Sequence, residues 1–184
     1  VAKHALQEIA GVRSEVVIAS EYAYTAATED SGTLVIPVSQ SGETADLIGV
    51  IKTAKSKGAK VRCLVNVAGS TIDRMSDGRL YFNCGPEIGV AATKSFLAPM
   101  MIGFLLAYAT AGREAEGREK LTALPKLARA CLDSNRDKCA KIAGDIAKKQ
   151  HAYFIARASN YPIALEGALK MKEISYVHAE GMPA

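Results

Sequence analysis

The sequence predicts an α/β fold with a mostly parallel β-sheet flanked by helices. Short apolar segments alternate along the chain with longer segments of helical spacing, which is typical of βαβ units. Residues 33–38 are apolar on both faces, as a central strand of a parallel sheet is. Because ligands bind beyond the carboxyl ends of the strands in such sheets, we expect the functional residues in the loops that follow the strands.

The first elements follow from local patterns. Residues 1–9 place their apolar side chains on one side of a helix. A short apolar strand is expected over residues 15–19, ahead of the strand at 33–38. Residues 44–57 have helical spacing, and Gly58 ends that helix.

The remaining elements are predicted in the same way. They are, in order, a strand over residues 60–65, a short capped helix over 70–74, a strand over 79–82, long helices over 92–149, a strand over 153–156 and a helix from Pro162 past Glu173. Within residues 92–149 we expect breaks near Gly112 and around residues 133–135.

The composition narrows the classes of function. The chain has 184 residues, with 23 Lys and Arg against 19 Asp and Glu. The basic residues are spread along the chain, so we expect no nucleic acid partner, whereas an anionic small molecule suits the mild positive balance. The four cysteines form no CxxC pair, and none of the three histidines lies at ligand spacing from Cys, Asp or Glu. We therefore expect no metal, no cofactor, and free thiols in a cytoplasmic protein.

One apolar segment needs a separate interpretation. Residues 95–110 carry no charge, but a membrane span needs about 20 apolar residues, and Pro99 and Gly103 interrupt this segment. We expect a helix in the core that also packs against a partner domain or subunit, and no membrane partner.

The clearest candidate site is the segment VSQSGET at residues 38–44. It follows an apolar strand and opens a helix, whose free N–H groups and partial positive charge bind phosphate. Ser39, Ser41 and Thr44 add hydroxyl groups, and Gly42 allows a tight turn. There is no GKS/T, so a nucleotide P-loop is excluded. The alternative is a plain helix cap, with a Ser or Thr N-cap and a capping-box carboxylate.

A second candidate is the set Glu166, Lys170 and Glu173, which share one helix face at positions i, i+4 and i+7. A carboxylate beside a lysine in a sugar pocket can move a proton between adjacent carbons. The alternative is a salt-bridge ladder on the surface. Burial of the three side chains would favour a functional role.

Two weaker signals remain. The loop of residues 85–94 leads into the apolar helix, and it either shapes a pocket or is a turn before a Thr-capped helix. In addition, residues 6–15 align with residues 171–180 at an offset of 165, with Glu, Ile, Val and Glu in common. This repeat predicts that a second copy of the domain begins near the end of the chain.

Three segments together resemble the glutamine–fructose-6-phosphate aminotransferase (glucosamine-6-phosphate synthase) family. They are VSQSGET at 38–44, EIGVAATK at 87–94 and YPIALEGALKMKEISYVHAE at 161–180. The resemblance covers essentially the whole chain, although SQSGET by itself marks sugar isomerase (SIS) domains in general. It implies two tandem SIS domains of flavodoxin-like topology. Residues 1–149 would be the first, lacking its first strand, and residues 150–184 the beginning of the second.

The resemblance also implies residue roles. Ser39, Gln40, Ser41 and Thr44 would hold the phosphate of fructose 6-phosphate or glucosamine 6-phosphate. Val90 and Ala92 would contact the sugar, and Ala92 stands where the family often has Ser, so this chain lacks that hydroxyl group. Glu173 would move the proton between C1 and C2, with Lys170 beside it.

The family implies further parts and partners. A glutaminase domain of the same polypeptide would supply ammonia, and the enzyme would be a homodimer. One phosphate-binding loop would precede Val1, the ring-opening histidine would follow Ala184, and the Schiff-base lysine would lie near the family's C-terminus, so we expect the fragment to be inactive alone. Two alternatives remain: a non-catalytic SIS module that binds a phosphosugar in a regulator, or another SIS sugar-phosphate isomerase or deglycase.

Overall fold

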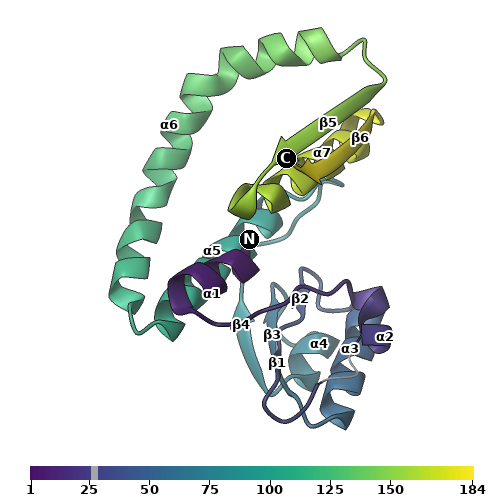
Figure 1. The fold of residues 1–184 in the computed structure, drawn as a ribbon, viewed down its shortest axis with the longest axis vertical. Helices are drawn as coiled ribbons and strands as arrows, with labels where there is room; N and C mark the ends of the chain where they lie inside the picture. The colour runs from purple at the N-terminus through teal and green to yellow at the C-terminus, as the bar shows by residue number, and fades with distance from the viewer. Residues whose placement is uncertain (26–28) are drawn as a thin grey trace. The chain divides into compact units, whose positions relative to one another are not determined.

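In the computed structural model, which describes residues 1–25 and 29–184, the chain divides into two units (Figure 1). The first unit comprises Glu15–Ile88 and Ala92–Ile102. The second unit comprises Val1–Ser14, Gly89–Ala91 and Gly103–Ala184. The domain boundary predicted between residues 149 and 150 stays a prediction.

The first unit contains the predicted parallel sheet. Its central strand is β3 (Lys60–Val65), which pairs in parallel with β1 (Leu34–Val35), β2 (Val38–Ser39) and β4 (Gly78–Tyr81). β1 and β2 are the two halves of the single strand predicted over residues 33–38. Pro37 lies between them and has no N–H group to donate, although its carbonyl accepts the Leu64 N–H at 2.9 Å.

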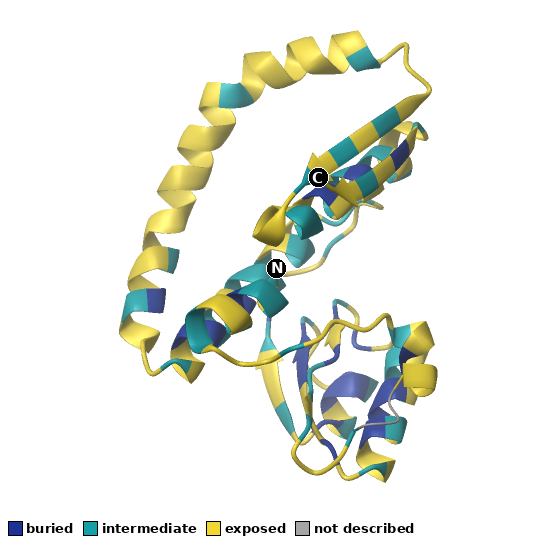
Figure 2. Ribbon diagram, in the orientation of Figure 1, coloured by how far each residue is buried: buried dark blue, intermediate teal, exposed yellow. Residues whose placement is uncertain are grey.

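Helices cover this sheet. α3 (Ala45–Ser56) and α4 (Thr71–Met75) follow β2 and β3, and η1 (Ala19–Glu21) and α2 (Tyr22–Thr25) contact α3. Figure 2 shows the buried residues concentrated on β3, α3 and α4. The largest fully buried side chains are Ile51, Val61, Cys63, Val65 and Ile72. This core holds the ends of β2, β3 and β4 in fixed positions.

The strand predicted over residues 15–19 is wrong. Residues 15–18 form no regular structure and Ala19 begins η1, while Val16 and Ile18 are each 72% exposed. None of the described strands pairs with this segment, and β1 and β2 both pair with β3. A strand is stable only when its backbone N–H and C=O groups find partners, and sequence pattern alone cannot supply them.

The second unit contains a βαβ element. β5 (His151–Ala156) and β6 (His178–Pro183) pair in parallel, and η3 (Ala158–Asn160) and α7 (Tyr161–Ser175) connect them. β6 was not predicted. Small residues allow the close packing of this element, since a Cβ on Gly167 would lie 2.9 Å from the Phe154 ring and one on Gly181 would lie 2.8 Å from the Leu165 backbone.

Two helices at the ends of the repeat support its alignment. α1 (Ala2–Ala10) is followed by Gly11 at φ 64°, and α7 is followed by Tyr176 at φ 58°. These two left-handed residues are 165 positions apart, which is the offset of the sequence repeat. The same offset aligns β6 with residues 13–18, where no strand forms. Both helices therefore end at a left-handed residue, whereas a strand follows α7 and none follows α1. The second domain copy stays a prediction.

Two long helices come between β4 and β5 in the sequence. α5 (Lys94–Thr110) and α6 (Glu114–Ile146) are separated near Gly112, which has φ 71°, as predicted. The second predicted break, around residues 133–135, is wrong because α6 continues through it. Ser134 Oγ and Asn135 Nδ2 donate back to the Cys131 carbonyl, at 3.1 and 2.8 Å, so these polar side chains are accommodated within the helix.

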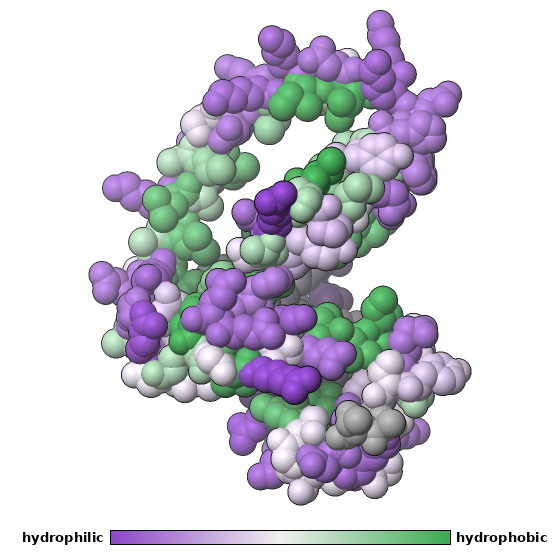
Figure 3. Space-filling model, in the orientation of Figure 1, coloured by the Kyte–Doolittle hydropathy of each residue, from purple (hydrophilic) through white to green (hydrophobic). Residues whose placement is uncertain are grey.

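α6 is largely exposed (Figure 2) and carries apolar side chains among charged ones (Figure 3). Leu127 is 62% exposed and Leu132 is 61% exposed.

The predicted packing of the apolar segment 95–110 against a partner domain or subunit stays a prediction. In the described part of the chain, no helix combines the length and the apolar character that crossing a bilayer requires.

Candidate functional site

Three loops of the first unit lie at the edge where β2, β3 and β4 end. Because the three strands are parallel, the loops that follow them meet at this edge, where the sequence leads us to expect the functional residues. They line an open pocket of 560 Å³. Its walls are formed by Gln40, Asn66, Val67, Ala68, Asn83, Gly85, Pro86 and Glu87. Gln40 is the one residue of the SQSGET segment among them.

The loop between β2 and α3 draws two of the predicted residues together. Ser39 is buried, and its Oγ accepts the Gly42 N–H at 3.0 Å and lies 3.1 Å from Thr44 Oγ1. Ser41 is exposed, and its Oγ accepts the Glu43 N–H at 3.2 Å. Thr44 is the N-cap of α3 but makes no side-chain cap. The first N–H groups of α3 are therefore not taken up by that side chain and can face a ligand.

Gly42 is required by both its conformation and its surroundings. It has φ 70°, and a Cβ at this position would lie 2.0 Å from Ser70 Oγ. Ser70 is 4% exposed, and its hydroxyl has no hydrogen-bond partner among the described residues. The loop after β3 thus packs directly on the SQSGET loop, a contact that the sequence does not reveal.

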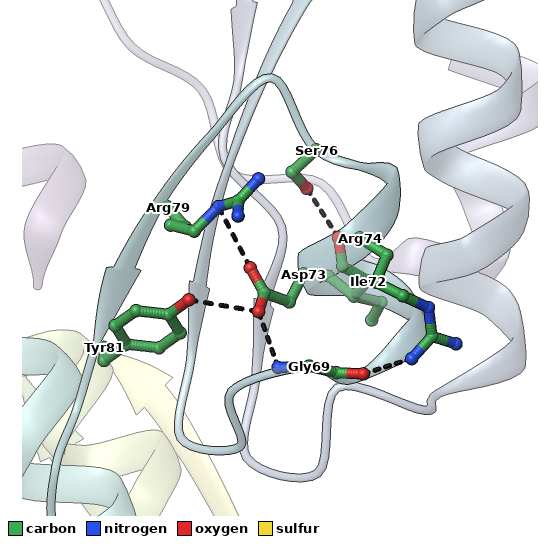
Figure 4. Close-up of polar contacts among 7 residues, drawn as sticks. All are labelled: Gly69, Ile72, Asp73, Arg74, Ser76, Arg79 and Tyr81. Carbon is green, nitrogen blue, oxygen red and sulfur yellow. Dashed lines mark hydrogen bonds and ion pairs between the residues drawn. The ribbon is translucent and has the colours of Figure 1, made fainter.

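Asp73 holds the loop after β3 in place (Figure 4). Its side chain is buried, and it accepts the Gly69 N–H at 2.7 Å and the Tyr81 hydroxyl at 3.0 Å, with Arg79 Nε at 3.1 Å. The Gly69 N–H is the main cause that lowers the pKa of Asp73, and the Tyr81 hydroxyl and Arg79 add to it. The helix predicted over residues 70–74 is confirmed, but Ser70 makes no side-chain cap, and Asp73 instead holds the backbone at Gly69, just before the helix.

Asn66 was missed by the sequence reasoning. It follows β3 directly, its Nδ2 donates to the Gly85 carbonyl at 2.8 Å, and its Oδ1 accepts the Cys84 N–H at 3.1 Å. Its side chain thereby joins the loop after β3 to the loop after β4. The available signal was an amide side chain immediately after a buried strand.

Glu87 closes the loop that precedes α5. Its carboxylate accepts the Ser95 N–H at 2.8 Å, the Thr93 N–H at 3.2 Å and the Thr93 hydroxyl at 3.1 Å. These hydrogen bonds, led by those at Ser95, lower the pKa of Glu87 to about 2. Within this loop, the side chain of Val90 is 89% exposed and that of Ala92 is half-buried. A helix follows this loop, as one interpretation predicts, but Glu87 accepts the N–H groups at its start and the Thr93 hydroxyl donates to Glu87, so the expected Thr cap is wrong. The loop also forms part of the pocket wall, and its role in binding stays a prediction.

We expect the N-terminal turn of α5 to loosen in acid. A carboxylate whose pKa is lowered in the folded state stabilises that state above its ordinary value of 4.5, and the stabilisation is lost as the pH falls toward about 2. The amide proton resonances of Thr93 and Ser95 should therefore titrate with a midpoint near pH 2. In Glu87→Gln the same resonances should show no such titration. A midpoint near 4.5 would contradict this assignment.

The second candidate set lies on α7, in the second unit. Lys170 Nζ is 2.5 Å from Glu173 Oε2 and 3.3 Å from Glu166 Oε1. The three side chains are only 19 to 27% exposed, and Glu173 Oε2 is fully buried with the ammonium group beside it. Burial by itself would lower the pKa of Lys170, but the two carboxylates outweigh it and raise that pKa. The structure thus brings the predicted triad together in a half-buried position.

The predicted site residues lie in both units. The phosphate candidates and Ala92 belong to the first unit, and Val90, Lys170 and Glu173 belong to the second. In the part of the chain that the structure describes, no group of three or more His, Cys, Asp or Glu side chains is arranged to hold a metal ion.

Comparison with known proteins agrees with this architecture. The model of the SIS domain family matches residues 1–109 and 145–184. The glutamine–fructose-6-phosphate aminotransferase [isomerizing] of Aquifex aeolicus is 47% identical to the chain over 188 residues, which cover 100% of this chain and 31% of that protein. The protein of the same name from Chlorobaculum tepidum is 41% identical over 191 residues, with the same coverage. The chain thus spans about a third of the length of these relatives.

Solved structures give the same result. The C-terminal domain of glucosamine-fructose-6-phosphate aminotransferase from Francisella tularensis matches 99% of this chain and 54% of that chain, with 35% identity and a TM-score of 0.88. A glucosamine-6-phosphate deaminase from Thermotoga maritima matches with a TM-score of 0.84 at 21% identity, which indicates a shared fold alone.

Proposed function

Because the chain belongs to the SIS domain family, we propose that it is part of the sugar isomerase portion of a glutamine–fructose-6-phosphate aminotransferase. The parent enzyme would convert fructose 6-phosphate and glutamine-derived ammonia to glucosamine 6-phosphate. The remaining two thirds of the relatives' length leave room for a glutaminase domain in the same polypeptide. We further propose a homodimer, in which the apolar helix α5 packs at an interface.

The observation that carries this proposal is the burial of the charged triad on α7. The pair of Arg118 and Glu114 on α6 is an ordinary surface pair, with side chains 65% and 52% exposed. Lys170 and Glu173 are 23% and 27% exposed, at a separation of 2.5 Å. Taking charges out of water is costly, and a surface ladder would not need it. A functional role explains why this charged set is retained where solvent is limited.

The proposed chemistry is a 1,2 proton shift. One proton moves from C1 of the fructose imine to C2, while the proton of the C1 hydroxyl group ends on the nitrogen as C1 becomes the aldehyde. A single carboxylate with access to both carbons can act as the base and then as the acid. We assign this role to Glu173. Lys170 Nζ, 2.5 Å from Glu173 Oε2, would hold that carboxylate in position.

The proposed phosphate site is the turn before α3. Three features support it: the helix start without a side-chain cap from Thr44, the adjacent hydroxyls of Ser39 and Thr44, and the tight turn at Gly42. Ser41 adds an exposed hydroxyl group, and Gln40 adds an amide group at the pocket wall. We propose that Val90 and Ala92 contact the sugar from the loop that Glu87 closes.

The test is the activity of the protein encoded by the natural reading frame that contains this chain. We expect it to form glucosamine 6-phosphate from fructose 6-phosphate and glutamine. Formation of glucose 6-phosphate without any use of glutamine would instead identify a simple isomerase. Binding of fructose 6-phosphate in calorimetry without any product would identify a regulatory module. Either outcome would overturn the proposal.

A further inference from the structure

The Glu43 side chain does not cap α3, and the acidic residue in the first turn of that helix is Asp46. Glu43 precedes the N-cap Thr44, and a negatively charged side chain is drawn to the positive end of a helix. A capping box would need Glu or Gln at the third helical position, where α3 has Leu47. The carboxylate of Glu43 is directed elsewhere, so the capping-box alternative for this segment is wrong.

The partner of Glu43 is the next helix. Its Oε1 accepts the Thr71 N–H, the first of α4, at 2.8 Å, and the neighbouring Gly42 carbonyl accepts the Ile72 N–H at 3.0 Å. The hydrogen bonds from Thr71 lower the pKa of Glu43, with a smaller contribution from the Arg74 charge. The start of α4 thus holds both the backbone of the SQSGET loop and its only acidic side chain.

We propose that Glu43 and the Thr71 N–H form a positioning pair for the phosphate site at α3. The pair keeps the loop in one conformation and holds the Glu43 carboxylate at α4, away from the helix start where the sugar phosphate would bind. A released carboxylate would be attracted to the same N–H groups as the phosphate and would repel it. This inference rests on the proposed function, in which residues 39–44 bind phosphate.

Position 71 allows the hydrogen bond to be removed with little other change. Thr71 is the first residue of α4, where proline is well tolerated because that N–H has no partner within the helix. The preceding Ser70 has φ −64° and ψ 165°, the extended conformation that a following proline demands. Thr71→Pro therefore removes the donor to Glu43. Thr71→Ala is the matched control, because it keeps the N–H, the larger of the two Thr71 contributions to Glu43, and removes the hydroxyl group, which adds the smaller contribution and accepts from Arg74 at 3.0 Å.

Two substitutions at position 43 distinguish the effect of the negative charge from that of the hydrogen bond. Glu43→Asp keeps the charge but shortens the side chain so that it falls short of the Thr71 N–H. Glu43→Gln keeps an acceptor oxygen of the same reach and removes the charge. If the negative charge itself assisted the reaction, the Gln variant would be the more impaired. The positioning role predicts the opposite order.

The experiment measures the dissociation constant of fructose 6-phosphate by calorimetry, together with KM and kcat, in the full-length protein. We expect Thr71→Pro and Glu43→Asp to weaken binding about tenfold, through repulsion between nearby negative charges. In both variants KM should rise by a larger factor than kcat falls. The dissociation constant of Thr71→Ala should be at least about threefold lower than that of Thr71→Pro, and that of Glu43→Gln at least about threefold lower than that of Glu43→Asp. A circular dichroism melt checks folding, and Glu43→Asp decides the question if Thr71→Pro does not fold.

Two results would overturn the inference: equal binding by Thr71→Pro and Thr71→Ala, or tighter binding by Glu43→Asp than by Glu43→Gln. Failure of the proposed function is a separate result, because it shows in the parent protein. If the parent binds fructose 6-phosphate but forms no glucosamine 6-phosphate, the binding comparison among the variants still tests the positioning pair.

Discussion

Glu173→Gln in the full-length protein is expected to reduce the formation of glucosamine 6-phosphate by at least about a hundredfold, the lower end of what a general base contributes. The amide has nearly the same size and can still contact Lys170, which lies 2.5 Å from Glu173 Oε2. It cannot accept the proton from C1. The hydrolysis of glutamine should continue, because that chemistry would belong to another domain. Parallel assays of glutamate and glucosamine 6-phosphate measure the two activities.

Glu114→Gln is the matched control for this variant. Glu114 is also a helical carboxylate with a basic partner, Arg118 at 2.6 Å, but its side chain is 52% exposed. Surface pairs of this kind contribute little, so we expect the parent rate of sugar formation. If Glu173→Gln also works at the parent rate, the triad on α7 is a salt-bridge ladder and the proposed base is wrong.

Gly42→Ala should be the most damaging single methyl addition in the first unit. The new Cβ would lie 2.0 Å from Ser70 Oγ and 2.4 Å from Ser70 Cβ, and the residue would keep φ 70°. Left-handed backbone conformation costs roughly 1–2 kcal/mol for a residue other than glycine, and overpacking costs roughly 1–3 kcal/mol. We therefore expect the free energy of unfolding to fall by roughly 2 to 5 kcal/mol. Urea denaturation of this chain measures it.

The same substitution at Gly49 is the control. Gly49 lies inside α3, and a Cβ there would meet nothing within 4 Å. Alanine is favoured over glycine in helices by about 0.8–1.0 kcal/mol, so Gly49→Ala should be neutral or stabilising. Adding Ser70→Gly to Gly42→Ala should recover the part of the loss that comes from the steric clash. If Gly42→Ala is as stable as the parent, the close packing of the two loops is wrong.

Much of the fold followed from local sequence pattern. β3, α3 and α7 were predicted nearly to their ends, because apolar periodicity, Gly58 after α3 and Pro162 at the start of α7 act within a few residues of where they stand. The SQSGET turn and the shared face of Glu166, Lys170 and Glu173 were predicted for the same reason. Backbone geometry places these side chains relative to one another whatever surrounds them.

Other features depended on partners far away in the sequence. Residues 15–19 have the composition of a strand and β6 does not, yet β6 is the one that pairs, with β5. The polar residues at 133–135 suggested a break, but side-chain bonds to the Cys131 carbonyl keep α6 continuous. Strand pairing requires a second strand within hydrogen-bonding distance, and that is a property of the folded chain rather than of a segment.

The sequence by itself determined the class of fold, the phosphate-loop candidate and the order of the charged residues on α7. Three features depended on the tertiary structure alone. Those charges are half-buried, Ser70 packs on Gly42, and Glu43 forms a hydrogen bond with α4 instead of capping α3. The physical reason is the distance along the sequence over which each interaction acts. Helix and turn preferences act over a few residues, whereas burial and the partner of a carboxylate depend on loops that parallel pairing brings to one edge of the sheet.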